Sequence, residues 1–179
     1  MKEHIEDLAR TKLFSGIEPK EIAGLLECLH ARCVHYAKDE MIVEDGSFVS
    51  EFGVMLSGHG RSIKWDASDK VITITLLQKG SEIGVMLAAS PNHKSPVAVQ
   101  AEDDCFVLFI PYDRLIARCQ RACGGHERLL RNYIGIVAEK GLVLHERITC
   151  LLKPSLREKV LTRKLKIPIR QAVISIMPM

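Results

Sequence analysis

The most apolar short stretch of the chain is Cys105–Ile110 (CFVLFI), and Pro111 follows it directly. A short apolar stretch of this kind predicts a β-strand. Similar stretches recur between about residues 31 and 113, separated by glycine-containing and polar turns. They are Cys33–Tyr36, Met41–Val43, Phe52–Leu56, Val71–Leu77 and Val97–Val99. Many short strands at this spacing favour an antiparallel barrel, roll or sandwich.

Helical spacing flanks this region on both sides. Before it, apolar residues within 3–13 recur at helical spacing, and Gly16 is a natural stop. Pro19 suits the first turn of a second helix, because its missing N–H costs nothing there. After the strands, residues 125–152 predict a helix of roughly 40 Å at 1.5 Å per residue. It ends before Pro154, since a residue that precedes proline avoids helical angles.

The long helix carries apolar residues at alternating steps of four and three. The members of this seam are Leu130, Ile134, Val137, Gly141, Leu144, Ile148 and Leu151. The period predicts that two copies of the chain pair in parallel as a homodimer. The alternative is a helix that lies across the roll of its own chain. Gly141 interrupts the apolar seam and costs about 1 kcal/mol of helix propensity. Three interpretations stay open for it: close approach of two helices, room for a ligand or a partner side chain, or a plain helix defect.

The composition is that of an ordinary globular protein. The 179 residues are 47% apolar and 26% charged, with a formal net charge of +3, which by itself does not argue for a nucleic-acid surface. No run of 18 apolar residues exists, so the sequence predicts no membrane partner. The first residues lack an apolar signal core, so a cytoplasmic location is expected. The six cysteines are then expected to be reduced thiols, metal ligands or core residues rather than disulfides.

The order of elements and several motifs resemble the Crp/Fnr family of transcription regulators. The segments that carry the resemblance are Leu13–Ile17, Val54–Gly58, Gly80–Gly84, Cys105–Pro111 and Ser155–Leu161. They are similar to the opening segment, a turn inside the roll, the start of the ligand cassette, the closing strand, and the first helix of the DNA-binding domain. The resemblance spans about residues 10–162.

The resemblance implies a mainly β fold with flanking helices. The expected fold is a double-stranded β-helix, a cupin-like jelly-roll of the cyclic-nucleotide-binding type, followed by a long C-terminal dimerisation helix. The expected divisions are N-terminal helices at 1–30, the roll at 31–115, the long helix at 116–152, and a hinge with a DNA-binding remnant and irregular tail at 153–179. The function implied is an effector-sensing and dimerisation domain of a transcription regulator.

The ligand cassette departs from the family pattern. Members that bind cyclic nucleotides place a glutamate for the ribose after the second glycine, and an arginine for the phosphate about ten residues later. Here Val85 follows Gly84, and the arginine position falls on Ser95, or on Lys94 with a one-residue shift. Lysine lacks the bidentate fork of arginine. Cyclic AMP and cyclic GMP are therefore not expected to bind.

The remaining cassette residues leave two interpretations open. The candidate effector pocket consists of Gly84, Val85, Met86, Leu87, Lys94, Ser95, Pro96 and Gly141. The apolar stretch from Val85 to Ala89 either fills the roll or receives an apolar or mixed small effector, whose identity the sequence does not reveal. His93 is expected to be a solvated loop residue and His59 an exposed turn residue.

Cys119, Cys123 and His126 form a weak candidate metal or redox site. A structural zinc or iron–sulfur site normally has four ligands, so packing is the stronger interpretation, and no cofactor is predicted. No arrangement of nucleophile, base and orienting residue, no phosphate-binding loop and no paired-histidine metalloprotease motif occurs, so the chain is not expected to be an enzyme.

Only 25 residues follow Pro154, whereas a winged helix-turn-helix needs roughly 60–70. The alternatives are a natural truncation, a disrupted gene or a boundary imposed on the chain. DNA is thus an expected partner only where the helix-turn-helix is present. The competing function is a stand-alone dimeric small-molecule-binding or interaction module that has no DNA-binding activity.

Overall fold

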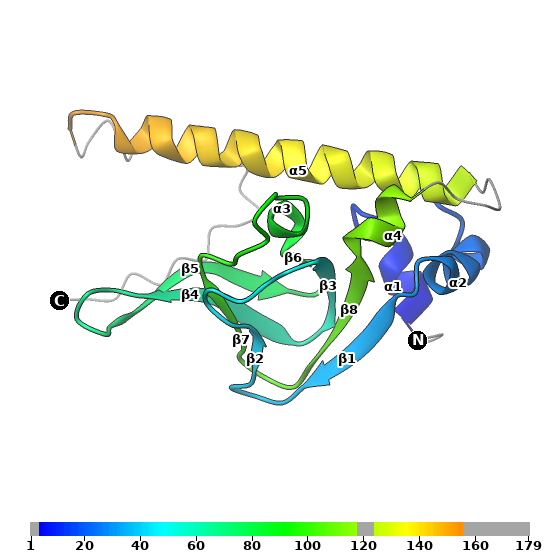
Figure 1. Ribbon diagram of the computed structural model, residues 1–179, viewed down its shortest axis with the longest axis horizontal. Coiled ribbons are helices and arrows are strands. Elements are labelled where there is room, and N and C mark those ends of the chain that lie inside the picture. Colours follow the sequence, from blue (N-terminus) through cyan, green and yellow to red (C-terminus); the bar gives the residue numbers. More distant parts are fainter. Residues whose placement is uncertain (1–3, 118–123, 156–179) are drawn as a thin grey trace. The chain divides into compact units, whose positions relative to one another are not determined.

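The computed structural model describes residues 4–117 and 124–155 of the chain. Within these residues, eight strands form two four-stranded antiparallel sheets (Figure 1). One sheet has the order β1 (Arg32–Tyr36), β8 (Cys105–Pro111), β3 (Glu51–Ser57) and β6 (Glu82–Ile83). The other has the order β2 (Met41–Val43), β7 (Ala98–Ala101), β4 (His59–Trp65) and β5 (Val71–Gln78). The jelly-roll predicted from the sequence is confirmed.

Strand β8 owes its apolar sequence to its central place in the first sheet. It pairs with β1 on one side and β3 on the other, so that Val107 faces Val34 and Met55 in the two registers. Both of its faces are covered. Leu108 and Ile110 belong to a core cluster that includes helical residues, and Val107 belongs to a second cluster inside the roll. A strand buried on both faces reads as a continuous apolar run rather than an alternating one.

The N-terminal helices are α1 (Ile5–Ala9) and α2 (Pro19–Cys28). Pro19 lies in the first turn of α2, as predicted. Helix α1 is shorter than the periodicity over 3–13 suggested. Near its end, the Thr11 hydroxyl donates a hydrogen bond to the carbonyl of Leu8 at 2.7 Å. A threonine side chain that bonds to the backbone in this way competes with the backbone hydrogen bonds of a helix.

Three further helices are α3 (Val85–Ala88), α4 (Tyr112–Ile116) and α5 (Gly124–Leu151). Helix α5 confirms the long helix predicted over 125–152, and Pro154 lies just beyond its end. The chain divides into two compact units, residues 1–137 and 138–179, and the division falls within α5. None of the helices in the described part of the chain has the length and apolar character that a membrane span requires.

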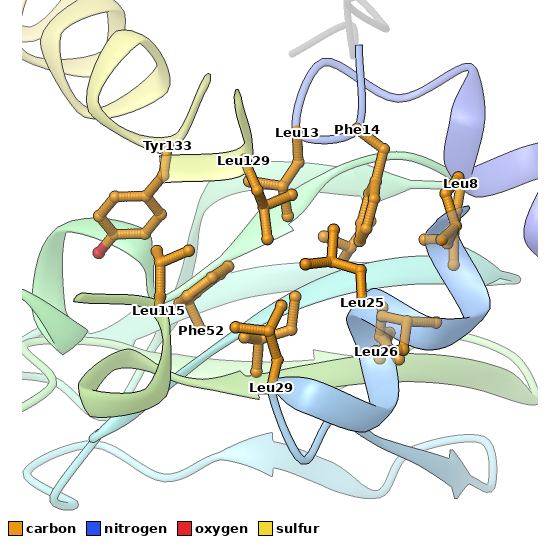
Figure 2. Packing of buried hydrophobic residues seen from close by; sticks show 14 of the residues in the cluster. Leu8, Leu13, Phe14, Leu25, Leu26, Leu29, Phe52, Leu115, Leu129 and Tyr133 are labelled. Carbon is orange, nitrogen blue, oxygen red and sulfur yellow. The ribbon is translucent and has the colours of Figure 1, made fainter. Parts of the chain in front are cut away.

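The first half of α5 completes the larger core cluster of residues 1–137. Leu129, Tyr133 and Ile136 recur at steps of four and three, and each is at most 4% exposed. All three belong to the cluster that contains Phe52 of β3 and Leu115 of α4. Figure 2 shows Leu129 and Tyr133 beside these two residues. Full burial of a side chain of this size contributes about 1.5–3 kcal/mol. This face of α5 is therefore committed to the chain's own core.

Candidate functional site

The candidate cassette begins at Gly84, directly after the short strand β6. Gly84 has φ +69°, a left-handed conformation that residues with a side chain rarely adopt. A Cβ at this position would also lie 3.1 Å from Cγ1 of Val49. A glycine is thus required where the chain turns from β6 into α3, which agrees with the motif recognised in the sequence.

Helix α3 presents two of its four side chains to the core. Val85 is 2% exposed and Ala88 is fully buried, whereas Met86 is 38% exposed and Leu87 is half-buried. Val85 and Ala88 belong to the cluster shared with the helices, not to the cluster inside the roll. The cassette helix is therefore partly a core element, but it fills a different layer from the roll interior considered at the sequence level.

Ser95 occupies the position expected for a phosphate-binding arginine, and its polar groups already have protein partners. The side chain is buried, and its hydroxyl donates to the carbonyl of Val97 at 2.7 Å. Its N–H donates to the carbonyl of Ser47, and its carbonyl accepts the N–H of Gly46. The serine therefore ties two loops together.

The loop formed by residues 44–49 closes against the loop around Ser95. The N–H of Val49 donates to the carbonyl of His93 at 2.7 Å, and Phe48 forms an isolated bridge with Lys94. The rings of Phe48 and His93 lie 4.9 Å apart, although Phe48 is 70% exposed. His93 also has φ +51° and a ring Nδ1 that lies 3.2 Å from the carbonyl of Val49. His93 is therefore half-buried and held in place, in contrast to the solvated residue expected.

Two lysines lie close to this loop. Lys94 is exposed. Lys64 of β4 donates a hydrogen bond from Nζ to the carbonyl of Pro96 at 3.0 Å. This contact could not be predicted from spacing in the sequence. Lys64 and Pro96 come close together only because β4 pairs with β7. Gly141 lies in the other compact unit, so its place in the pocket stays a prediction.

The predicted dimer seam lies beside the face of α5 that packs in the core, and the two overlap at Leu130 and Val137. Leu130 and Val137 are half-buried against the core cluster, and Gly141 is half-buried. The remaining members are exposed to 59% at Ile134, 45% at Leu144, 56% at Ile148 and 69% at Leu151. Unpartnered large apolar side chains at this period are what a coiled-coil partner would cover.

His126 of the weak metal candidate is buried in the first turn of α5. Its Nε2 lies 2.7 Å from the carbonyl of Leu115, which makes this nitrogen the donor, and Nδ1 has no hydrogen-bond partner among the described residues. Cys119 and Cys123 lie outside the described residues. Within 4–117 and 124–155, no three histidine, cysteine or acidic residues form a group that could hold a metal ion.

An ion pair that the sequence did not indicate joins His59 at the start of β4 to Asp103 in the turn before β8. Nδ1 of His59 lies 2.7 Å from Oδ2 of Asp103, and the His59 N–H donates to Oδ1 at 2.6 Å. The exposed histidine predicted at this position is confirmed. The hydrogen bond to Asp103 raises the pKa of His59 above its ordinary 6.5, and the bond to His59 lowers the pKa of Asp103 below its ordinary 3.8.

This pair is expected to stabilise the fold only within a pH window. Its contribution is lost as pH rises through the raised pKa of His59, and as pH falls through the lowered pKa of Asp103. Substitution Asp103→Asn keeps the acceptor oxygen and removes the charge. A histidine NMR titration should then show the pKa of His59 falling toward 6.5. An unchanged titration in the variant would mean that the carboxylate does not pair with His59 in solution.

The jelly-roll with a cassette between β6 and β7 defines the chain as a cyclic-nucleotide-binding-like domain. Residues 33–122, half of the chain, match the model of the cyclic nucleotide-binding domain. The chain therefore belongs to the cyclic nucleotide-binding domain family. No curated protein sequence matches it.

Solved structures share this fold at low sequence identity. A cyclic nucleotide-binding domain from Methylobacillus flagellatus has a TM-score of 0.68 and 17% identity over 87% of this chain and 85% of its own. The sensor domain of the transcriptional regulator DNR from Pseudomonas aeruginosa has a TM-score of 0.61 and 16% identity over 87% and 97%. A cAMP-binding acyltransferase from Mycobacterium smegmatis has a TM-score of 0.53 and 19% identity over 73% and 39%.

Proposed function

We propose that this chain is the effector-sensing and dimerisation part of a Crp/Fnr-type transcription regulator whose effector is neither cyclic AMP nor cyclic GMP. The fold supports the sensing role in a transcription regulator, because transcriptional regulators recur among the solved structures that resemble the chain. The sequence carries no arrangement of nucleophile, base and orienting residue, which favours a binding role over an enzymatic one. A cytoplasmic location accompanies this proposal.

One observation carries the exclusion of cyclic nucleotides, namely the burial of Val85 and Ser95 with their own protein contacts. Val85 offers no side-chain acceptor to a ribose hydroxyl, and the Ser95 hydroxyl is already bonded to Val97. A cyclic phosphate at this loop would meet lysines instead of the arginine of the family pattern, and lysine lacks the bidentate fork that arginine offers a phosphate. We expect an apolar or mixed small effector instead, since Met86 of α3 is an exposed apolar side chain.

The seam of α5 supports a parallel dimer. In a heptad written abcdefg, Ile134, Gly141 and Ile148 occupy position a, and leucine occupies position d at 130, 144 and 151. β-Branched residues at a with leucine at d favour two strands. The homodimer therefore uses a face of α5 adjacent to the face that packs in the core.

Titration calorimetry with cyclic AMP and cyclic GMP tests the effector proposal directly. We expect no binding heat for either nucleotide with the full chain, up to millimolar ligand, because the phosphate and ribose contacts are missing. A cyclic-AMP-binding relative measured in parallel is the control for ligand quality. A micromolar Kd for either nucleotide would contradict the proposal.

A further inference from the structure

We propose that Tyr133 is a latch that holds the cassette helix α3 against the first half of α5 without any ligand. The hydroxyl of Tyr133 donates a short hydrogen bond to the backbone carbonyl of Val85. Both residues lie in the unit formed by residues 1–137, and they are 48 positions apart in the sequence. The bond therefore joins the first residue of α3 to the long helix.

The Val85 carbonyl needs such a partner because α3 is only four residues long. The last four carbonyls of any helix lack a partner within that helix, so the carbonyls of α3 rely on other groups or on water. Val85 is 2% exposed, and a buried carbonyl that loses its partner pays its desolvation cost. Tyr133 meets this need from another element of the fold.

The ring of Tyr133 is held so that its hydroxyl stays on this carbonyl. The side chain is 3% exposed and projects from α5 into the core (Figure 2). Its ring centroid lies 4.7 Å from that of Phe52 and 5.7 Å from that of Tyr112. Burial raises the pKa of Tyr133, so its hydroxyl remains a proton donor throughout the physiological pH range.

The other residues of α3 make few buried contacts, so loss of the Tyr133 hydrogen bond is expected to affect the stability of α3 locally. Met86 is exposed, and only Val85 and Ala88 contribute buried side chains. Short segments with few buried contacts open at lower free energy than the core strands. Because Tyr133 also packs with Leu129 and Ile136 in the core face of α5, displacement of α3 and displacement of this half of α5 are linked. The latch requires neither an effector nor a second copy, so it goes beyond the proposed function.

Native-state hydrogen exchange of the full chain carrying Tyr133→Phe tests the latch. Phenylalanine keeps the ring and removes the donor. The probe is the Ala88 N–H, which donates to the Gly84 carbonyl at 2.9 Å. We expect it to exchange about tenfold faster than in the unmodified chain, the loss expected for one buried hydrogen bond, while the amides of β8 are unchanged.

Tyr112→Phe is the matched control, because it removes the other hydroxyl of the same aromatic cluster and should leave α3 exchange unchanged. Unaltered exchange in α3 of the Tyr133→Phe chain would overturn the latch. An equal acceleration of α3 and β8 would also overturn it, since that result would indicate a general loss of stability. Neither outcome depends on nucleotide binding or on the oligomeric state.

Discussion

Leu144→Asp is expected to convert the proposed dimer into monomers. Leu144 occupies position d of the seam and is 45% exposed on the single chain, so the substitution leaves the protomer core intact. In a parallel dimer the change occurs twice, and two carboxylates would meet inside an apolar seam without a cation. We expect dissociation to become easier by about 3 kcal/mol or more, roughly hundredfold in Kd. Sedimentation equilibrium at micromolar concentration measures this change.

Leu142→Asp is the control for this experiment. Leu142 is 67% exposed, lies on the same turn of α5 and follows Gly141 at position b, away from the seam. The same change of charge and volume should therefore leave the dimer intact. Two results would contradict the dimer proposal, namely a monomeric unmodified chain at micromolar concentration, or equal dissociation in the two variants.

Gly58→Ala is expected to destabilise the fold more than an ordinary surface substitution. Gly58 lies in the turn between β3 and β4 with φ +75°, where a side chain costs about 1–2 kcal/mol. A Cβ there would also lie 2.5 Å from Cβ of Cys105 and 2.6 Å from the carbonyl oxygen of Asp104. Overpacking adds about 1–3 kcal/mol, so we expect a total loss of about 2–5 kcal/mol in urea unfolding.

Gly46→Ala separates the two causes. Gly46 has the same φ of +75°, but no atom lies within 4 Å of the Cβ position. Its substitution should cost only the backbone strain, about 1–2 kcal/mol. The difference between the two variants then measures the clash at Gly58. An equal loss in both would mean that the β3–β4 turn relaxes around the new methyl group.

Patterns within single segments made much of the fold predictable. The run at Cys105–Ile110 predicted the central strand, Pro19 and Pro154 marked where α2 begins and α5 is over, and Gly84 marked the turn into the cassette. These features act locally, through burial of a short strand, fixed backbone angles and a missing N–H. The departures at Val85 and Ser95 were likewise visible as residue types, because neither side chain can replace a carboxylate or a guanidinium.

The contacts that build the site were not predictable in this way. Tyr133 was not recognised, because its partner is a backbone carbonyl 48 residues away that any residue type would provide. Strand β4 was also missed, because its glycine and charged residues interrupt the apolar pattern. The hydrogen bond between Lys64 and Pro96 was therefore missed as well. The pair of His59 and Asp103 depends on two turns that only the closed roll brings together.

The sequence by itself determined the jelly-roll, its family resemblance, the long helix with its seam, and the loss of the usual ligand side chains. The long helix, its seam and the lost ligand side chains depend on residue type and periodicity along one segment, whereas the jelly-roll was implied by the family resemblance across many segments. Tertiary structure decided which face of α5 enters the core. It also decided that the polar groups of Ser95 bond to neighbouring loops and that Tyr133 joins the cassette to α5. The physical reason is that helix α5 has two neighbouring apolar faces, and only the packing of distant residues selects the one that is buried.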